Sequence, residues 1–434
     1  MTAVRGEAAP ENRRGSFPGF IEAAACRGQL VVQPRMGFSD PRRMHEGLRA
    51  VKSASATTVG TITLDSYTRT GDLATASKAL ATGAPLNGYP ITSHPIDVTR
   101  GMLDDVRDVG FPVQVRHGSP APQGVFRALT RLGIDASEGG PVSYCLPYGA
   151  MPLRDSIRNW KESCHIFAEL QDRGVQPHLE TFGGCMMGQL APPSILIAIS
   201  VLEAMFFRQN GVPSVSLSYA QQTSLAQDLA GISALRRLTT DLLGDGDWHI
   251  VVYAYMGVFP RTAPGGRLLG EAAVRLAVHG GAQRVIVKTT AEATRIPTIE
   301  DNVAALEHAA LVAATLDEPE GRLDREESAA EVYAEAAALV YGVLDLRQDI
   351  GEALGVAFQK GYLDVPFCLH PDNRGRARSF ITADGRLAWS DTGAMPLRDV
   401  VEISPRHRMT SAELMSALSY VADGFDKHFP DCPR

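Results

Sequence analysis

The chain has 434 residues, of which 44% are hydrophobic and 21% are charged, a balance typical of a globular protein with one large domain and an appendage. Its net charge of -7 argues against nucleic acid or an anionic membrane as a partner, because both require a basic face. The expected partner is therefore a small molecule or another protein.

Residues 1–25 lack the apolar core of a signal peptide, and we expect them to form a flexible N-terminal lead. The most apolar run, SILIAISVLEAMFF from Ser194, is too short to cross a bilayer and is interrupted by Ser200 and Glu203, so it predicts a buried helix. The six cysteines form no CxxC pair. Together these features predict a cytoplasmic protein with reduced thiols.

Eight short β-branched runs, each followed by helix-like sequence, predict a parallel (β/α)8 barrel, or TIM barrel, over residues 26–300. In chain order the runs are LVVQPRM, TVGTITLDSYTR, FPVQVRHG, PVSYCLPY, PHLETFGG, SVSLSY, IVVYAYMGVF and RVIVKTT. Their spacing is close to the ~30 residues of one βαβ unit, apart from a longer insertion between Asp65 and Arg116.

Residues 301–434 are expected to form C-terminal helices and a small extension that acts as a cap or an interface. The Ala- and Leu-rich stretch SAAEVYAEAAALVYGVLDLRQDIGEAL predicts helices. The segment RSFITADGRLAWS predicts a β-hairpin around Asp384 and Gly385.

Charged side chains stand where the predicted strands give way to loops: Arg35, Arg69, Arg116, Glu180 and Lys288. In a barrel these ends converge on the face that carries the chemistry. Arginines in a closed pocket need carboxylates or phosphates as partners, because an unpaired buried guanidinium is unfavourable by several kcal/mol. The partners are either Asp40, Asp65 or Glu138, which would make the arginines structural, or the acidic groups of a ligand.

The stretch EGGPVSYCLPY supplies the opposite charge. Its middle predicts a strand, with the carboxylate of Glu138 before two glycines and with Tyr144 and Tyr148 facing one side. Three guanidiniums, one carboxylate and two phenols match a ligand with two carboxylates and one ammonium, such as an acidic amino acid. The alternative is a buried pair of Glu138 and an arginine, with both tyrosines reaching to the rim.

Other motifs are weaker. The segment GDGDWH from Gly244 breaks the GxGxxG pattern of a dinucleotide loop, and no His or Cys cluster indicates a metal site. Lys288, at the end of VIVK, is a candidate Schiff-base nucleophile of a barrel enzyme.

Nine ordered motifs resemble the large, or epsilon, subunit of adenosylcobalamin-dependent glutamate mutase, an enzyme also called methylaspartate mutase. They are PRMGF, SYTR, LNGYP, VRHG, EGGPVSYCLPY, ETFGG, APPS, MGVFP and VKTTAEATRIPT, and the resemblance extends from about residue 29 to GYLDVPF at Gly361. That family has a (β/α)8 barrel, in agreement with the eight runs.

The resemblance implies roles for matching positions. The substrate carboxylates would be clamped by Arg35, Arg69 and Arg116, with His117 also lining the site. Glu138 would hold the ammonium and act as the base, while Tyr144 and Tyr148 would donate hydrogen bonds to the substrate; Tyr148, like the arginines and Glu138, is a candidate catalytic residue. The positions implied to contact adenosylcobalamin are Gly37, Asn87, Pro147, Phe259, Lys288, Glu292 and Ile296.

The implied reaction is the reversible conversion of L-glutamate to (2S,3S)-3-methylaspartate. Homolysis of the cobalt–carbon bond gives an adenosyl radical that takes a hydrogen from the substrate. The substrate radical then splits into a glycyl radical and acrylate, which rejoin on the branched skeleton. The cofactor supplies the difficult chemistry, and the protein holds the charged fragments in place.

The resemblance also implies a partner. The cobalamin-binding signature DxHxxG is absent, because Asp247-Trp248-His249 is followed by Val252 where the signature requires glycine. In the family this motif lies on a separate small subunit, which shares the cofactor with a homodimer of the large subunit in a heterotetramer. The same assembly is expected here.

Departures from the family pattern are few. The N-terminal region is shorter than usual, Tyr253 and Tyr255 stand where the family has a different polar and aromatic pair, and Cys145 lies among substrate-side residues. These differences leave the exact dicarboxylate and the pathway open. The alternatives to a mutase are a cobalamin-independent lyase or aldolase acting through Lys288, and a non-catalytic amino-acid-binding paralogue, which the presence of Lys288 and Glu292 disfavours.

Overall fold

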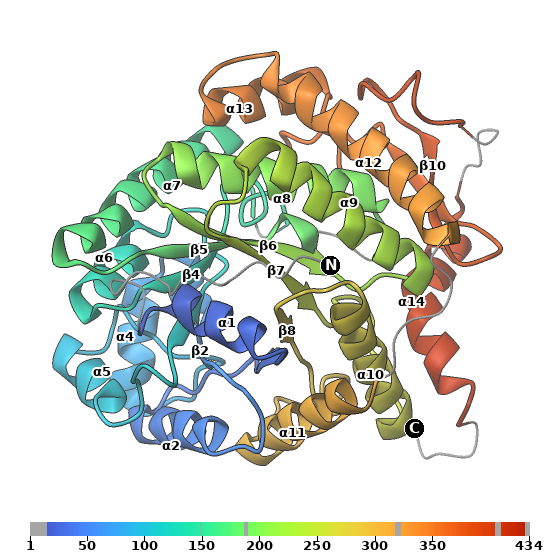
Figure 1. Cartoon of the computed structure of the whole chain (residues 1–434). Helices are drawn as coiled ribbons and strands as arrows, with labels where there is room; N and C mark the ends of the chain where they lie inside the picture. The colour runs from blue at the N-terminus through green and yellow to red at the C-terminus, as the bar shows by residue number, and fades with distance from the viewer. Residues whose placement is uncertain (1–14, 148, 186–189, 317–322, 404–408, 430–434) are drawn as a thin grey trace.

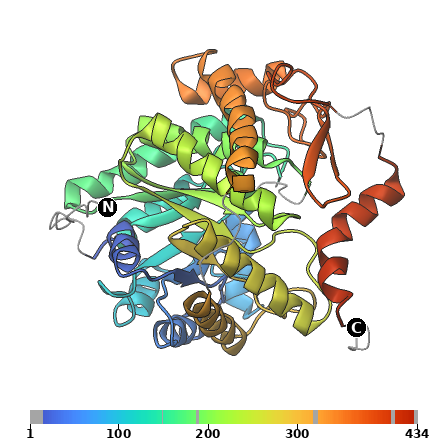
Figure 2. The same cartoon turned by 45° about the vertical axis from the view of Figure 1, so that its right-hand side comes forward.

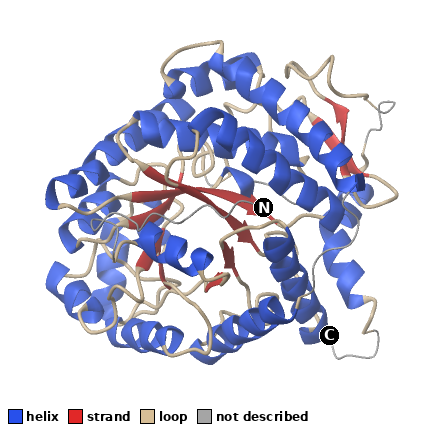
Figure 3. Ribbon diagram, in the orientation of Figure 1, coloured by secondary structure: helices blue, strands red, loops and turns tan. Residues whose placement is uncertain are grey.

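A computed structural model describes residues 15–147, 149–185, 190–316, 323–403 and 409–429. Its centre is a sheet of eight parallel strands enclosed by helices, as the red strands inside the blue ring of Figure 3 show. The strands are β1 (Val31–Gln33), β2 (Gly60–Thr63), β3 (Val113–Arg116), β4 (Ala136–Gly139), β5 (His178–Thr181), β6 (Ser214–Ala220), β7 (Trp248–Tyr253) and β8 (Arg284–Ile286). This confirms the predicted α/β barrel.

The strands pair in the order β1-β8-β7-β6-β5-β4-β3-β2, and every pair is parallel. A parallel bridge between Val32 and Thr58 joins the two edges, with the Val32 amide 2.9 Å from the Thr57 carbonyl oxygen. The barrel is therefore nearly closed, so all the carboxyl ends of its strands surround one mouth.

The helices around the barrel are α2 (Pro41–Lys52), α3 (Ser66–Thr70), α4 (Leu73–Thr82), α5 (Ile96–Leu103), α6 (Gln123–Leu132), α7 (Leu153–Ala168), α8 (Pro193–Gln209), α9 (Leu225–Leu243), α10 (Ala263–His279) and α11 (Ile299–Thr315) (Figure 1). Two short 3-10 helices, η2 (Glu169–Arg173) and η3 (Gly183–Cys185), flank β5. Helices α3, α4 and α5 form the long insertion between β2 and β3. Each amphipathic helix buries one stripe, as α6 does with Val125, Phe126 and Leu129.

The amino-terminal end of the barrel is closed by helix α1 (Phe17–Cys26). Phe17 is fully buried, and its ring lies 5.3 Å from the ring of His178 and 5.1 Å from Cζ of Arg284. Its amide also donates a 2.7 Å hydrogen bond to Asp135. The prediction of a flexible lead over residues 1–25 is therefore wrong for α1, because Phe17 and Ile21 bury apolar surface against the barrel.

The fourth predicted strand is also misplaced. Strand β4 is the preceding ASEG, and PVSYCLP forms a turn in which the Tyr144 amide donates to the Gly140 carbonyl oxygen at 3.1 Å. Gly139 has a φ of 129°, which ends the strand, and Pro141 has no amide hydrogen for a strand ladder. Glu138 thus lies on the strand and Tyr144 on the turn, so the prediction of two tyrosines on one strand is wrong.

Beyond the barrel the chain forms α12 (Leu323–Leu344), α13 (Ile350–Lys360), the antiparallel pair β9 (Arg378–Ile381) and β10 (Leu387–Asp391), and α14 (Ser411–Asp426). Helix α12 packs across α8 and α9, and α14 packs beside α10 (Figure 2). The predicted hairpin and C-terminal helices are confirmed. The boundary placed near residue 300 falls at the start of α11, which contacts α10, α2 and β1 and so completes the barrel ring.

Helix α8 confirms the buried helix expected from Ser194: almost all of its residues are buried. No helix in the described part of the chain is both long and apolar enough to cross a membrane.

Candidate active site

Three arginines come from neighbouring strand ends at the barrel mouth. Arg35 follows β1 by two residues, Arg69 lies in α3 after β2, and Arg116 is the last residue of β3. The Thr63 amide donates to the Met36 carbonyl oxygen at 2.8 Å, and the Leu64 amide donates to the Arg116 carbonyl oxygen at the same distance. These bonds hold the three segments side by side, as the barrel prediction required.

Arg116 and Glu138 form a buried ion pair. Nε of Arg116 lies 2.6 Å from Oε2 of Glu138, and their side chains are 5% and 2% exposed. Nη1 of Arg116 is buried and has no hydrogen-bond partner among the described residues. Arg116 is therefore paired with Glu138, as one of the two open interpretations held. Its guanidinium nevertheless keeps one donor, Nη1, for another acceptor.

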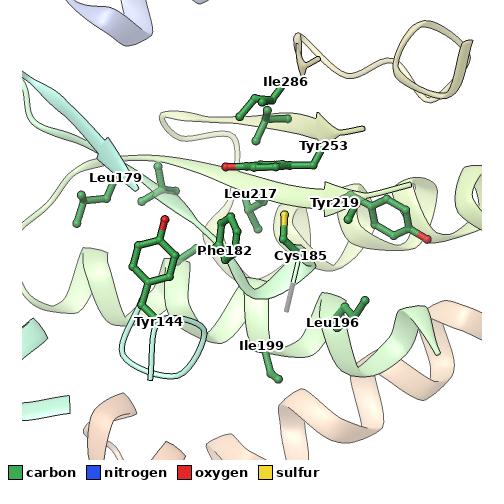
Figure 4. Close-up of a cluster of buried hydrophobic side chains, with 14 of the residues drawn as sticks. Tyr144, Leu179, Phe182, Cys185, Leu196, Ile199, Leu217, Tyr219, Tyr253 and Ile286 are labelled. Atoms are coloured by element: carbon green, nitrogen blue, oxygen red, sulfur yellow. The ribbon is translucent and has the colours of Figure 1, made fainter. Parts of the chain in front are cut away.

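Two tyrosine hydroxyls also contact Glu138. Tyr144 donates to Oε1, and Tyr253 donates to Oε2 at 2.7 Å. Figure 4 shows both hydroxyl groups directed toward the same region of the barrel interior, with Phe182 beside them. Tyr144 is 2% exposed and does not reach to the rim, which contradicts that part of the alternative interpretation. In the sequence, Tyr253 stands out only as a departure from the family, because its contact with Glu138 depends on barrel closure.

Tyr253 also contacts Glu180, which lies inside β5 and not at the mouth. Glu180 is fully buried and pairs with Arg284 of β8, and Gln114 donates to it at 3.2 Å. Ser216 donates to the same carboxylate at 3.3 Å. The placement of Glu180 among the mouth residues was therefore wrong: its side chain belongs to a polar network lower in the barrel. Glu180 shares the inner face of β5 with His178, and its level in the barrel follows from its pairing with Arg284, the first residue of β8.

His117 is a neutral hydrogen-bond donor at the edge of the site. Its Nδ1 accepts a 3.1 Å bond from the Ser119 amide, which places the proton of the neutral ring on Nε2. Nε2 is buried and has no partner in the described chain, and burial lowers the pKa of His117 to about 3. The ring stacks on Trp160 with centroids 5.6 Å apart and meets the Tyr144 ring edge-on at 5.1 Å. An orphaned, rigidly held N–H suits an acceptor on a ligand.

The other two arginines have unused donors. The guanidinium of Arg69 makes no hydrogen bond or ion pair with any described residue, and Cδ of this side chain lies 3.1 Å from the position that a Cβ on Gly118 would occupy. Arg35 approaches Glu292 only at 3.9 Å, and its side chain is 33% exposed. Asp40 and Asp65, the other suggested partners, instead cap α2 and α3. The mouth therefore offers donors from three guanidiniums and one imidazole.

Lys288 and Glu292 lie beside Arg35, because they follow β8, the strand that pairs with β1. Nζ of Lys288 is 4.0 Å from Oε2 of Glu292 and 5.3 Å from the centre of the Phe259 ring. Burial, followed by repulsion from Arg35, lowers the pKa of Lys288 to about 8.

The remaining positions expected to contact a cofactor lie around these residues or nearer the surface. Ile296 is 68% exposed, Asn87 is exposed and accepts a 2.9 Å bond from the Ser66 amide, and Pro147 is half-buried at the end of its turn. A Cβ on Gly37 would lie 2.2 Å from the Thr63 carbonyl oxygen, so glycine is required there for close strand packing. Tyr148 lies outside the described residues.

Cys145 points away from the site: its Sγ lies 3.2 Å from the Met151 carbonyl oxygen and 3.8 Å from Nε2 of His370. Across the described residues, no group of three or more His, Cys, Asp or Glu side chains could hold a metal ion.

Comparisons with known proteins give one family over most of the chain. Residues 10–415 match the family described as methylaspartate mutase E chain (MutE). The chain is 32% identical over 413 residues to a glutamate mutase epsilon subunit of Halobacterium salinarum, covering 93% of this chain and 85% of the relative. It is 30% identical to that of Desulfitobacterium hafniense, covering 92% and 84%. Among solved structures, a truncated 3-deoxy-D-arabino-heptulosonate 7-phosphate synthase from Thermotoga maritima aligns over 65% of this chain and 84% of that one, with a TM-score of 0.37 and 10% identity. Because this similarity is low, the fold assignment rests on the strand pairing.

Proposed function

The chain belongs to the methylaspartate mutase E chain family, and we propose that it is the catalytic subunit of a mutase that interconverts L-glutamate and (2S,3S)-3-methylaspartate. The observation that carries this proposal is the set of unused donors on Arg35, Arg69 and Arg116 beside Glu138. A ligand with two carboxylates and one ammonium would satisfy this set. L-Glutamate has these groups.

Each side chain contributes through hydrogen bonds and charge. The arginines clamp the two carboxylates, and the Nε2 hydrogen of His117 is a further donor. Glu138 holds the ammonium and accepts its proton when required, while Tyr144 and Tyr253 keep the carboxylate in place. Because each substrate fragment still carries a carboxylate after the carbon skeleton breaks, the arginine clamp keeps both fragments in the site until they rejoin. Tyr148 is proposed as a further donor to the substrate.

The mouth fits adenosylcobalamin. Lys288 and Glu292 present a charged pair beside the buried ring of Phe259, and exposed apolar side chains, Ile296 and Val258 among them, stand on the loops after β8 and β7. Lys288 and Glu292 would hold the adenosyl group, with Gly37, Asn87, Pro147, Phe259 and Ile296 lining the corrin side. When bound, the cofactor supplies the radical that removes a hydrogen atom from the substrate.

A second subunit completes the proposed enzyme. The name epsilon subunit, which the relatives carry, belongs to a multi-subunit protein, and this chain lacks DxHxxG. We propose that a small subunit with DxHxxG shares the cofactor, in a heterotetramer built on a homodimer of this chain. The described cysteines Cys26, Cys145, Cys164, Cys185 and Cys368 are free thiols, which supports a cytoplasmic location.

The deciding experiment mixes the chain with a small DxHxxG subunit, adenosylcobalamin and L-glutamate, and measures 3-methylaspartate. We expect product only when all four are present. The variant Arg116→Met should lose at least about a hundredfold in turnover, because a buried, charge-assisted clamp is removed. Full turnover by this variant would contradict the clamp, and absence of product from the complete wild-type mixture would contradict the mutase.

The lowered pKa of Lys288 favours one second candidate, a cobalamin-independent lyase or aldolase in which this amine forms a Schiff base with the substrate. Borohydride treatment in the presence of the substrate would then attach it covalently to Lys288. A strict requirement for adenosylcobalamin would exclude this candidate.

A further inference from the structure

Glu203 is a carboxylate in the middle of the apolar helix α8, and it binds the turn that follows β4. Its Oε1 accepts hydrogen bonds from the Val142 amide at 3.1 Å and the Ser143 amide at 2.9 Å. Its Oε2 accepts a third bond from the Ser143 hydroxyl at 2.9 Å. One side chain thus satisfies two backbone donors that the turn itself leaves unpaired.

No cation accompanies this carboxylate in the described structure. Glu203 is fully buried, and its partners are neutral donors, whereas Glu138 and Glu180 each pair with an arginine. Burial raises the pKa of Glu203 to about 7. A buried, uncompensated carboxylate is unfavourable in an otherwise apolar helix, so its hydrogen bonds to the turn are its evident contribution.

The turn fits closely against Glu203. A Cβ on Gly140 would lie 2.0 Å from Oε1, so only glycine permits this approach. On the other side, Ser156 of α7 donates to the Pro141 carbonyl oxygen at 2.7 Å. The same turn carries Tyr144, whose hydroxyl donates a hydrogen bond to Glu138. The position of Tyr144 relative to Glu138 therefore depends on how firmly the turn is held.

We propose that Glu203 is a positioning residue of the mutase site: by accepting three hydrogen bonds it fixes the turn of residues 140–147, and so places Tyr144 against Glu138. It acts through hydrogen-bond acceptors and not through its charge. The kinetic part of this inference rests on the proposed function, whereas the structural part can be measured on the protein alone.

The test compares Glu203→Gln with Glu203→Leu. Glutamine can still accept from both amides and can donate to the Ser143 hydroxyl, so we expect wild-type amide hydrogen exchange at Val142 and Ser143 and kinetics within about twofold of wild type. Leucine has no acceptor, so exchange at these amides should rise at least about tenfold, and kcat/KM for L-glutamate in the assembled enzyme should fall about tenfold or more. If Glu203→Leu does not fold, the milder Ser143→Ala replaces it in the test. This variant removes only the hydroxyl bond to Glu203 and should lower kcat/KM about two- to threefold.

Glu335→Leu is the matched control. Glu335, on α12, accepts hydrogen bonds from Ser194, at the start of the helix that carries Glu203, and from Trp389. Neither partner belongs to the turn. This variant should lose stability without faster exchange at Val142 and Ser143 and without a change in KM. The proposal is overturned if Glu203→Gln is as impaired as Glu203→Leu, if Glu203→Leu keeps slow exchange, or if Glu335→Leu gives the same kinetic loss. If neither the wild-type enzyme nor any variant forms product, the proposed function is wrong. The exchange data still decide whether Glu203 anchors the turn.

Discussion

The lower and upper halves of the barrel interior contain similar charged groups in different states. In the lower half, Arg284 bonds to Glu180 and Gln33 and lies beside Ser216 and His249, so its donors are used within the protein. At the mouth, the Arg69 guanidinium has no partner in the described chain and Arg116 keeps an unpaired Nη1. A buried arginine therefore indicates a ligand only when its donors remain unused.

Loss of Arg284 should have the largest effect on stability. Arg284→Met would leave Glu180 buried without its cation, and breaking a buried ion pair in this way costs about 3–5 kcal/mol. Chemical denaturation measures the change in the free energy of unfolding. The exposed pair of Arg100 with Asp97 provides the control, since Arg100→Met should change stability hardly at all. If the two variants were equally stable, the buried charges of the lower half would not contribute to stability as proposed here.

Loss of Arg69 should leave stability unchanged but weaken substrate binding. Because the Arg69 guanidinium has no partner among the described residues, Arg69→Met should leave the free energy of unfolding within about 0.5 kcal/mol of wild type. It should raise KM for L-glutamate about ten- to hundredfold, since a charge-assisted hydrogen bond to the ligand is worth ~1.5–3 kcal/mol. Steady-state kinetics and denaturation of the same preparation test both parts. Arg49→Met, on the exposed face of α2, should alter neither quantity, and an unchanged KM in Arg69→Met would place this arginine outside the site.

Tyr253 joins the two halves, because its hydroxyl contacts both Glu138 and Glu180. Tyr253→Phe keeps the ring under Arg116 and removes only the hydroxyl. We expect kcat to fall about tenfold, since Glu138 loses one of the hydrogen-bond donors that hold its carboxylate. Steady-state kinetics of the variant and of wild type measure the change. A kcat equal to that of wild type would show that the halves act independently.

Several elements followed from local sequence. The β-branched runs located seven of the eight strands, and SILIAISVLEAMFF located the buried helix α8. The fourth strand was missed, because Val142 and Tyr144 resemble strand residues while Gly139 and Pro141 end the ladder before them. Helix α1 was missed because its burial requires the far end of the barrel as a partner.

Local sequence was enough to predict arginines at adjacent strand ends near Glu138, because parallel strands place these ends on one face. Which of these groups have hydrogen-bond partners within the protein depends on contacts between distant parts of the chain. Glu180 pairs with Arg284, more than a hundred residues away in sequence, and Glu203 reaches the turn of Tyr144 from another helix. Such contacts depend on barrel closure and side-chain direction, which no local pattern specifies. Closure therefore separates the structural charges from those left available for a ligand.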